Sequence, residues 1–142
     1  MGQWRRFSAF VTKDSNCAPA IAHSLQFARN FLEGRDYEPR LKIKLVILVE
    51  ELVANALRHG GKSQDLALLL VLEGGEEAIT LEMVDDGPEF DPLSAPPVTG
   101  PDPTTGGGIG LAIVNAWGED GVHSREAGFN TLKLTLRHGS AG

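Results

Sequence analysis

A leucine-rich segment between Pro39 and Gly60 constrains the fold of this chain more than any other. Five of its apolar residues recur at intervals of three and four: Leu41, Leu45, Leu48, Leu52 and Ala56. Side chains at this spacing lie on one face of an α-helix, and we expect that face to form core. Pro39 suits a first helical position, and the pair Gly60-Gly61 predicts a left-handed C-cap.

A second row on the same predicted helix carries polar residues that can do chemistry. Glu51 and Asn55 are one turn apart, so a carboxylate and a carboxamide point together from the edge of the apolar face. Such a pair can hold a water and a divalent ion. Taken alone, two such residues are more often ordinary surface positions.

The other segments predict a strand-rich chain with further helices. Residues 66–72 are all apolar, which indicates a buried strand, whereas residues 79–83 alternate as in a strand with one covered face. In the last strand, Leu132, Leu134 and Leu136 point inward. The predicted strands are 4–12, 66–72, 79–83, 122–126 and 131–137, and the other helices are about 15–32 and 111–117. We expect the 142 residues to form a single domain.

The distribution of charge argues against nucleic acid as a partner. The net charge is −6, but residues 1–62 carry ten Lys and Arg against six Asp and Glu, and residues 63–142 carry three against thirteen. A phosphate backbone would meet mainly carboxylates along the C-terminal half. The apolar run 66–72 is too short for a membrane span, and the single Cys17 excludes an internal disulfide. We therefore expect a cytoplasmic protein that binds neither nucleic acid nor membrane.

An irregular segment at about 91–107 leads into a glycine-rich helix start. Six of the eight prolines fall between residues 88 and 106. In a compact domain such a loop is usually a functional lid or disordered. Gly106, Gly108 and Gly110 leave backbone N–H groups free at a positive helix end, which is how a chain holds phosphate oxygens. A flexible hinge is an equally good interpretation of the glycines alone.

Three motifs in this order resemble the GHKL superfamily of ATPases, which includes gyrase, histidine kinases and mismatch repair proteins. The motifs are Glu51-x-x-x-Asn55, Asp85-x-Gly87 and Gly106-x-Gly108-x-Gly110. The chain is most similar to the bacterial anti-sigma-factor serine/threonine kinases, which also begin with a short strand and a helix. This resemblance implies an α+β fold, a two-layer α/β sandwich with helices on one face of a mixed, mostly antiparallel sheet, known as the Bergerat-type ATP-binding fold.

The resemblance also implies that ATP and Mg²⁺ bind between the helix layer and the lid. Glu51 is similar to the family's general base, and Asn55 to its magnesium ligand. Arg58 and His59 match positions that help to hold the phosphates. Asp85 resembles the aspartate that accepts a hydrogen bond from the adenine amino group.

The remaining implied nucleotide contacts lie on glycine-rich turns and on a late strand. Gly87 is expected to leave room for the base beside Asp85. The other implied contacts are Gly106, Gly108, Ile109, Gly110, Leu111 and Thr131.

The implied function is that of an ATP-binding regulatory protein, an anti-sigma factor with serine/threonine protein kinase activity. Its expected partners are a sigma factor and an antagonist protein, and the sequence leaves dimerisation open. One alternative is a histidine-kinase-type catalytic domain acting in trans, because residues 108–114 match that family's lid helix. Another is an ATP-gated binding module without transfer activity. Two departures from the family weaken the case for phosphoryl transfer more than the case for ATP binding. Glu89 stands where the family commonly has a glycine, and the lid has no basic residue.

Overall fold

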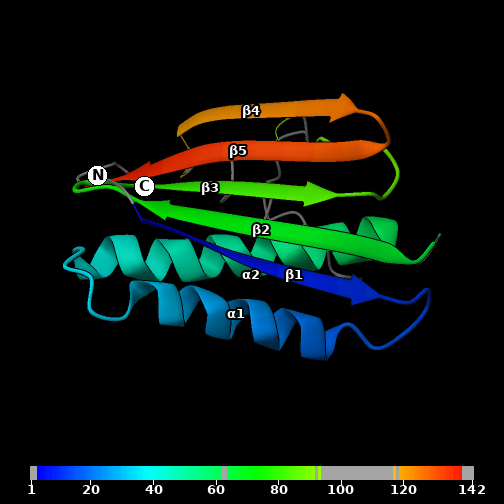
Figure 1. Ribbon diagram of the computed structural model, residues 1–142, viewed down its shortest axis with the longest axis horizontal. Coiled ribbons are helices and arrows are strands. Elements are labelled where there is room, and N and C mark those ends of the chain that lie inside the picture. The colour runs from blue at the N-terminus through cyan, green and yellow to red at the C-terminus, as the bar shows by residue number, and fades with distance from the viewer. Residues whose placement is uncertain (1–2, 62–63, 92, 94–116, 118, 139–142) are drawn as a thin grey trace, which may run out of the picture.

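The computed structural model describes residues 3–61, 64–91, 93, 117 and 119–138. In the described part of the chain, two helices cover one face of a five-stranded sheet, as the sequence predicts for an α+β fold (Figure 1). The elements are β1 (Gln3–Val11), α1 (Ala18–Leu32), α2 (Pro39–Gly60), β2 (Leu66–Gly74), β3 (Ala78–Asp85), β4 (Glu119–Glu126) and β5 (Phe129–Arg137).

The sheet is antiparallel in every described pairing. Its strand order is β1-β2-β3-β5-β4. The expectation of a mixed sheet is therefore wrong for the part of the chain that the structure describes. The reason is visible in Figure 1: α1 runs back along the sheet from the end of β1 and α2 returns. After two helices the chain enters β2 at the end where β1 finished, so the two strands are antiparallel.

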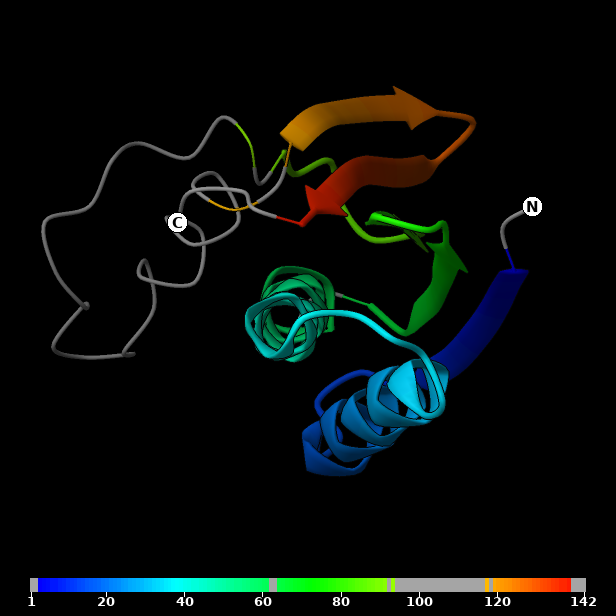
Figure 2. The same cartoon turned by 90° about the vertical axis from the view of Figure 1, so that its left-hand side faces the viewer.

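Helix α2 packs its predicted apolar face on the sheet. Leu45, Leu48 and Leu52 are fully buried. The sheet positions that face them alternate with less buried ones, because successive strand residues point to opposite faces. These inward residues are Leu66, Leu68, Leu70, Leu72, Ile79, Leu81, Met83, Leu132, Leu134 and Leu136. Figure 2, which looks along the helices, shows α2 in the curve of the sheet with α1 beside it near β1.

Strand β2 differs from its prediction as a buried strand. Its burial pattern alternates, so the helices cover only the face that includes Leu68 and Leu70. Ala67, Leu69 and Val71 point to the other face and are half-buried. An unbroken apolar run therefore did not mean a strand covered on both faces.

The end of α2 is closed by packing and not by the predicted left-handed cap. Gly61 has a φ of −69°, in the right-handed region, so that prediction is wrong. Gly60 is needed for a close approach, since a Cβ there would lie 2.7 Å from Cδ1 of Leu66 and 3.6 Å from Cα of Gly87. The end of α2 therefore contacts the turn that follows β3.

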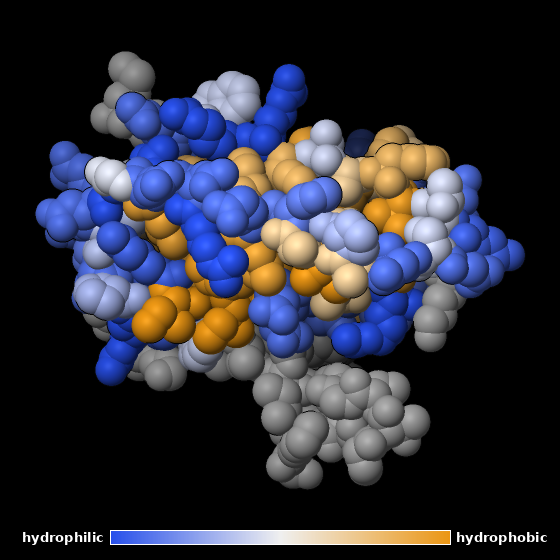
Figure 3. Space-filling view, turned by 90° about the horizontal axis from the view of Figure 1, so that it is seen from below, coloured by the Kyte–Doolittle hydropathy of each residue, from blue (hydrophilic) through white to orange (hydrophobic). Residues whose placement is uncertain are grey.

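The surface of the described residues is a mixture of hydrophilic and apolar side chains. Seen from below, orange apolar patches lie between blue hydrophilic residues (Figure 3). Trp4, Phe10, Val122 and Phe129 are exposed and belong to the sheet face that the helices leave uncovered. Among the described helices, none is both long and apolar enough to cross a membrane.

Leu48→Ala should test the packing of α2. Leu48 is fully buried, so its truncation should lower the free energy of unfolding by about 2–5 kcal/mol, as measured by urea denaturation. Ile43→Ala on the same helix is the control, because Ile43 is 61% exposed and its loss should cost roughly 0.5 kcal/mol or less. Equal losses in the two variants would contradict the assigned face.

Candidate nucleotide-binding site

Asp85, at the end of β3, lies at the centre of the candidate site. Its Oδ1 accepts hydrogen bonds from the backbone N–H of Gly87 at 2.9 Å and from the side-chain amide of Asn130 at 3.0 Å. Its second oxygen, Oδ2, has no hydrogen bond to the described residues. Oδ2 is therefore free to accept a hydrogen bond from a water or a ligand.

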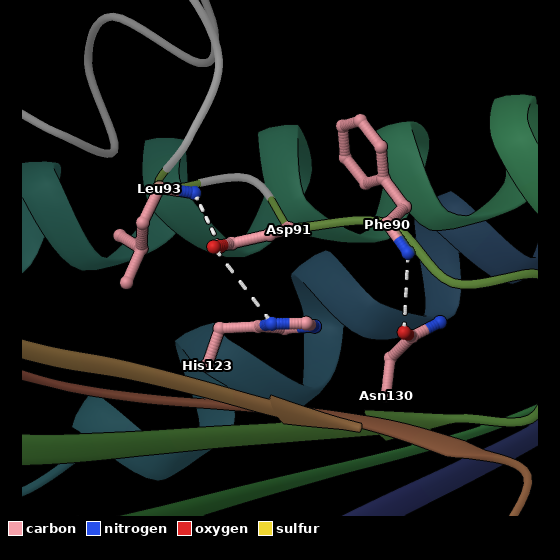
Figure 4. A network of polar contacts seen from close by, with 5 residues as sticks. All are labelled: Phe90, Asp91, Leu93, His123 and Asn130. Atoms are coloured by element: carbon pink, nitrogen blue, oxygen red, sulfur yellow. Dashed lines mark hydrogen bonds and ion pairs between the residues drawn. The ribbon is translucent and has the colours of Figure 1, made fainter.

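Asn130, at the start of β5, holds the turn that follows Asp85. Its side-chain N–H also donates to the carbonyl of Pro88 at 2.8 Å, and its Oδ1 accepts from the backbone N–H of Phe90 at 3.2 Å (Figure 4). Arg125 on β4 donates to the carbonyl of Gly87 at 2.6 Å. These bonds tie the turn to the β4–β5 hairpin.

Thr131, an implied nucleotide contact, does not lie on the same face of the sheet as Asp85. Along β5, Asn130 and Leu132 face the helices, whereas Thr131 points to the uncovered face, where it pairs with Val84. Asn130 occupies the position expected for Thr131. The signal was present in the sequence, because the inward alternation that includes Leu132 and Leu134 places Asn130 on the same side.

Gly87 has a packing role in this conformation. A Cβ at Gly87 would lie 3.0 Å from Oδ1 of Asp85, 3.0 Å from Cδ1 of Leu66 and 3.4 Å from Cα of Gly60. The missing side chain therefore lets the turn approach the end of α2. Gly87 does not line the neighbouring pocket, to which Asp85 belongs, so its expected role beside the base stays a prediction.

Helix α2 presents Asn55 to this region. Asn55 is buried, and its Oδ1 accepts a hydrogen bond from Nη1 of Arg58 at 2.8 Å. A carboxamide oxygen suits Mg²⁺, so the residue fits the ligand role that the resemblance implies. In this conformation the guanidinium of Arg58 already uses that oxygen, and a cation would have to displace or share this bond.

Glu51 and His59 have pKa values shifted in opposite directions. Burial raises the pKa of Glu51, and the neighbouring Glu50 raises it further, while Arg58 opposes the shift. Burial lowers the pKa of His59, and Arg58 lowers it further, which favours the neutral ring. The His59 ring stacks on Phe90 with centroids 4.0 Å apart. Glu51 is therefore a better proton acceptor than an ordinary carboxylate, and His59, whose neutral ring is favoured, is a weak partner for phosphate.

A small pocket lies between α2 and the sheet at this point. Its lining residues are Leu52, Asn55, Ala56, Met83, Asp85, Phe90, His123, Asn130 and Leu132. Its volume is about 20 Å³, which is room for about one water. A purine needs more space, so nucleotide binding requires a lining side chain to move. The sequence did not predict Phe90 and His123 as lining residues, because contacts between distant segments bring them to the pocket. Phe90 bonds to Asn130 on β5, and His123 is placed by the register of β4 on β5.

A family model described as a histidine kinase-like ATPase domain matches residues 15–136. The chain belongs to this family. Such a domain supports an ATP-binding regulatory role. The solved structure of the Acinetobacter baumannii histidine kinase AdeS is similar at 15% identity and a TM-score of 0.47, over 95% of this chain and 69% of that chain. No curated protein sequence matches significantly.

Part of the predicted site of this histidine kinase-like ATPase domain lies outside the described residues. Within the lid prediction, 91–107, only Asp91 and Leu93 are described. The roles given to the glycine-rich segment stay predictions. The residues concerned are Gly106, Gly108, Ile109, Gly110 and Leu111.

Asn130→Ala should loosen the site of this ATPase domain. The change removes a donor to Asp85 and Pro88 and an acceptor for Phe90, so the free energy of unfolding should fall by about 1–3 kcal/mol in urea denaturation. Thr131→Ala, one residue along on the opposite face, should cost roughly 0.5 kcal/mol or less. A larger loss of unfolding free energy for Thr131→Ala than for Asn130→Ala would contradict the conclusion that Asn130, and not Thr131, faces the site.

Proposed function

We propose that this domain binds ATP with Mg²⁺ and transfers the γ-phosphoryl group to a serine or threonine of an antagonist protein. We propose further that it acts as an anti-sigma factor. The observation that carries the kinase proposal is Glu51, a half-buried carboxyl with a raised pKa, one helical turn before Asn55. Histidine kinases usually carry Asn at this position. A serine hydroxyl, unlike an imidazole nitrogen, must lose a proton as it is phosphorylated, so a base at Glu51 favours a hydroxyl acceptor.

Asp85 supports adenine as the base. Its Oδ2 is without a described partner and can accept a hydrogen bond from the amino group of adenine. Guanine has a carbonyl at the corresponding position, and two acceptors would repel each other. The pocket therefore favours ATP over GTP.

Two residues of α2 support binding of the phosphates. When bound with ATP, Mg²⁺ would neutralise part of the phosphate charge, and the amide oxygen of Asn55 is the side-chain ligand that suits it. Arg58 holds that oxygen at 2.8 Å and, once released, can donate to phosphate oxygens.

In the proposed transfer, Glu51 orients the acceptor hydroxyl and takes its proton. The hydroxyl oxygen forms a bond to the γ-phosphorus while the bond from that phosphorus to the bridging oxygen breaks, and ADP leaves. The proton moves to Glu51 late in the reaction. The raised pKa of Glu51 brings the carboxylate closer to the basicity that this role needs.

The closed pocket favours an ATP-gated binding module as the second candidate. At about 20 Å³ it cannot hold a purine, and Phe90 lines it. Nucleotide binding would then displace residues of the turn and change the nearby surface without any transfer. Glu89 and the lid without a basic residue agree with this reading. The trans-acting histidine kinase is a third candidate, because residues 108–114 match the lid helix of that family. The structure does not describe these residues.

Asp85→Asn should weaken ATP binding. The change replaces one acceptor oxygen by a donor at nearly constant shape, and loss of a charge-assisted hydrogen bond should cost about 1.5–3 kcal/mol in isothermal titration calorimetry. The preference for ATP over GTP should shrink as well. Glu82→Gln is the control, because Glu82 lies on the same strand but on the uncovered face. Unchanged ATP affinity in Asp85→Asn would refute the base pocket.

Glu51→Gln should slow transfer and leave nucleotide affinity intact. Loss of a positioned base typically costs about 10²–10⁴-fold in rate. The measurement is transfer of label from ATP to a candidate antagonist protein. Glu50→Gln is the matched control, since Glu50 is the exposed neighbour about 100° round the helix.

The same assay separates the alternatives. Label on histidine would favour the trans-acting histidine kinase. Tight ATP binding without detectable transfer by the wild-type protein would favour the gated module. Equal rates for wild type and Glu51→Gln would remove Glu51 from the mechanism.

A further inference from the structure

His123 on β4 has a largely covered side chain that the proposed function does not use. Its side chain is 9% exposed, and its Nε2 has no hydrogen-bond partner in the described structure. It lines the pocket together with Asp85 and Asn130. Figure 4 shows His123 and Asn130 rising from the sheet side by side toward the segment of Phe90 and Asp91. A buried nitrogen without a partner is unfavourable, so a water or a ligand must satisfy it.

Asp91 indicates which nitrogen of the His123 ring carries the proton. Oδ2 of Asp91 lies 3.8 Å from Nδ1. A lone pair on Nδ1 would be repelled by this carboxylate, so in the neutral ring the proton sits on Nδ1. Nε2 is then an acceptor. The pocket therefore offers two acceptors to a ligand, Nε2 of His123 and Oδ2 of Asp85.

The sheet places these two acceptors well apart. Asp85 pairs with Asn130 on β5, and His123 pairs with Leu132, two residues further along the same strand. Since β3 and β4 flank β5, usual strand spacings put the Cα atoms of Asp85 and His123 roughly 12 Å apart. This separation is comparable with the length of a nucleoside. If Asp85 accepts from the amino group at one end, His123 faces the other end, where the ribose is attached.

We propose that Nε2 of His123 accepts a hydrogen bond from a ribose hydroxyl of the bound adenine nucleotide. The inference rests on the proposed function, which places the base at Asp85. Once the amino group of adenine is engaged, the ribose hydroxyls are the donors that the nucleoside has left. A nucleotide without the contacted hydroxyl leaves Nε2 buried and unpaired, so the pocket selects nucleotides that carry this hydroxyl.

The test compares nucleotide selectivity in two matched variants. His123→Phe keeps a ring of similar size but lacks nitrogen. His138→Phe is the control: Nε2 of His138 is also buried without a described partner, but its ring packs on Tyr37, with centroids 5.6 Å apart, at the opposite end of β5. Calorimetry with Mg²⁺ would measure the affinities for ADP, 2′-deoxy-ADP and 3′-deoxy-ADP.

Wild type and His138→Phe should bind ADP about tenfold more tightly than one of the two deoxy analogues, which corresponds to one ordinary hydrogen bond. His123→Phe should bind ADP about tenfold more weakly than wild type and should not distinguish the three ligands.

A preference for ADP that persists in His123→Phe would overturn the ribose contact and leave ATP binding intact. Equal wild-type affinities for all three ligands would do the same, and this comparison decides even if His123→Phe does not fold. No binding of ADP or ATP to the wild-type protein would overturn the proposed function, and the inference with it.

Discussion

Helix α2 buries its leucine face in the curve of the sheet, and this contact places the candidate site residues of the helix. Each fully buried leucine contributes about 1.5–3 kcal/mol relative to an exposed one, so the rotation of the helix about its axis is strongly fixed. Asn55 lies beside that face, and the same rotation therefore sets its side chain in the pocket that Asp85 lines at the end of β3, with Glu51 one helical turn earlier. The close approach of Gly60 to Gly87 then brings the helix end against the turn after Asp85.

The turn after Asp85 is held mainly by hydrogen bonds, beside the packing of Gly87 on the end of α2 and the stacking of Phe90 on His59. Asn130 alone bonds to Asp85, Pro88 and Phe90. Such a segment can be displaced at less cost than a packed strand, because water can replace its polar partners. Since the pocket is closed in this conformation, the apparent affinity for a nucleotide is reduced by the cost of opening it. Nucleotide binding would therefore be coupled to a change in the surface around Phe90, which lines the pocket.

Arg58 connects the electrostatics of the site. It donates to Asn55, opposes the rise in the pKa of Glu51 and contributes to the fall in the pKa of His59. If this guanidinium moved toward phosphate oxygens, it would free the Asn55 oxygen. Arg58 would then also lower the pKa of Glu51 less. A bound nucleotide would in this way bring the carboxyl closer to the basicity that proton transfer needs. The guanidinium of Arg58 thus binds the Asn55 oxygen in the closed conformation and would bind phosphate oxygens in the proposed nucleotide-bound one.

The sequence by itself determined the features that depend on local periodicity. Helix α2 runs from Pro39 to Gly60 as its spacing predicted, and the order of the motifs led to the family that the family model confirms. Contacts between distant segments were decided only by the tertiary structure. Examples are Asn130 in the place expected for Thr131, and His123 in the pocket. Strand register and the approach of one element to another depend on hydrogen bonds and packing across the sheet, which no single segment encodes.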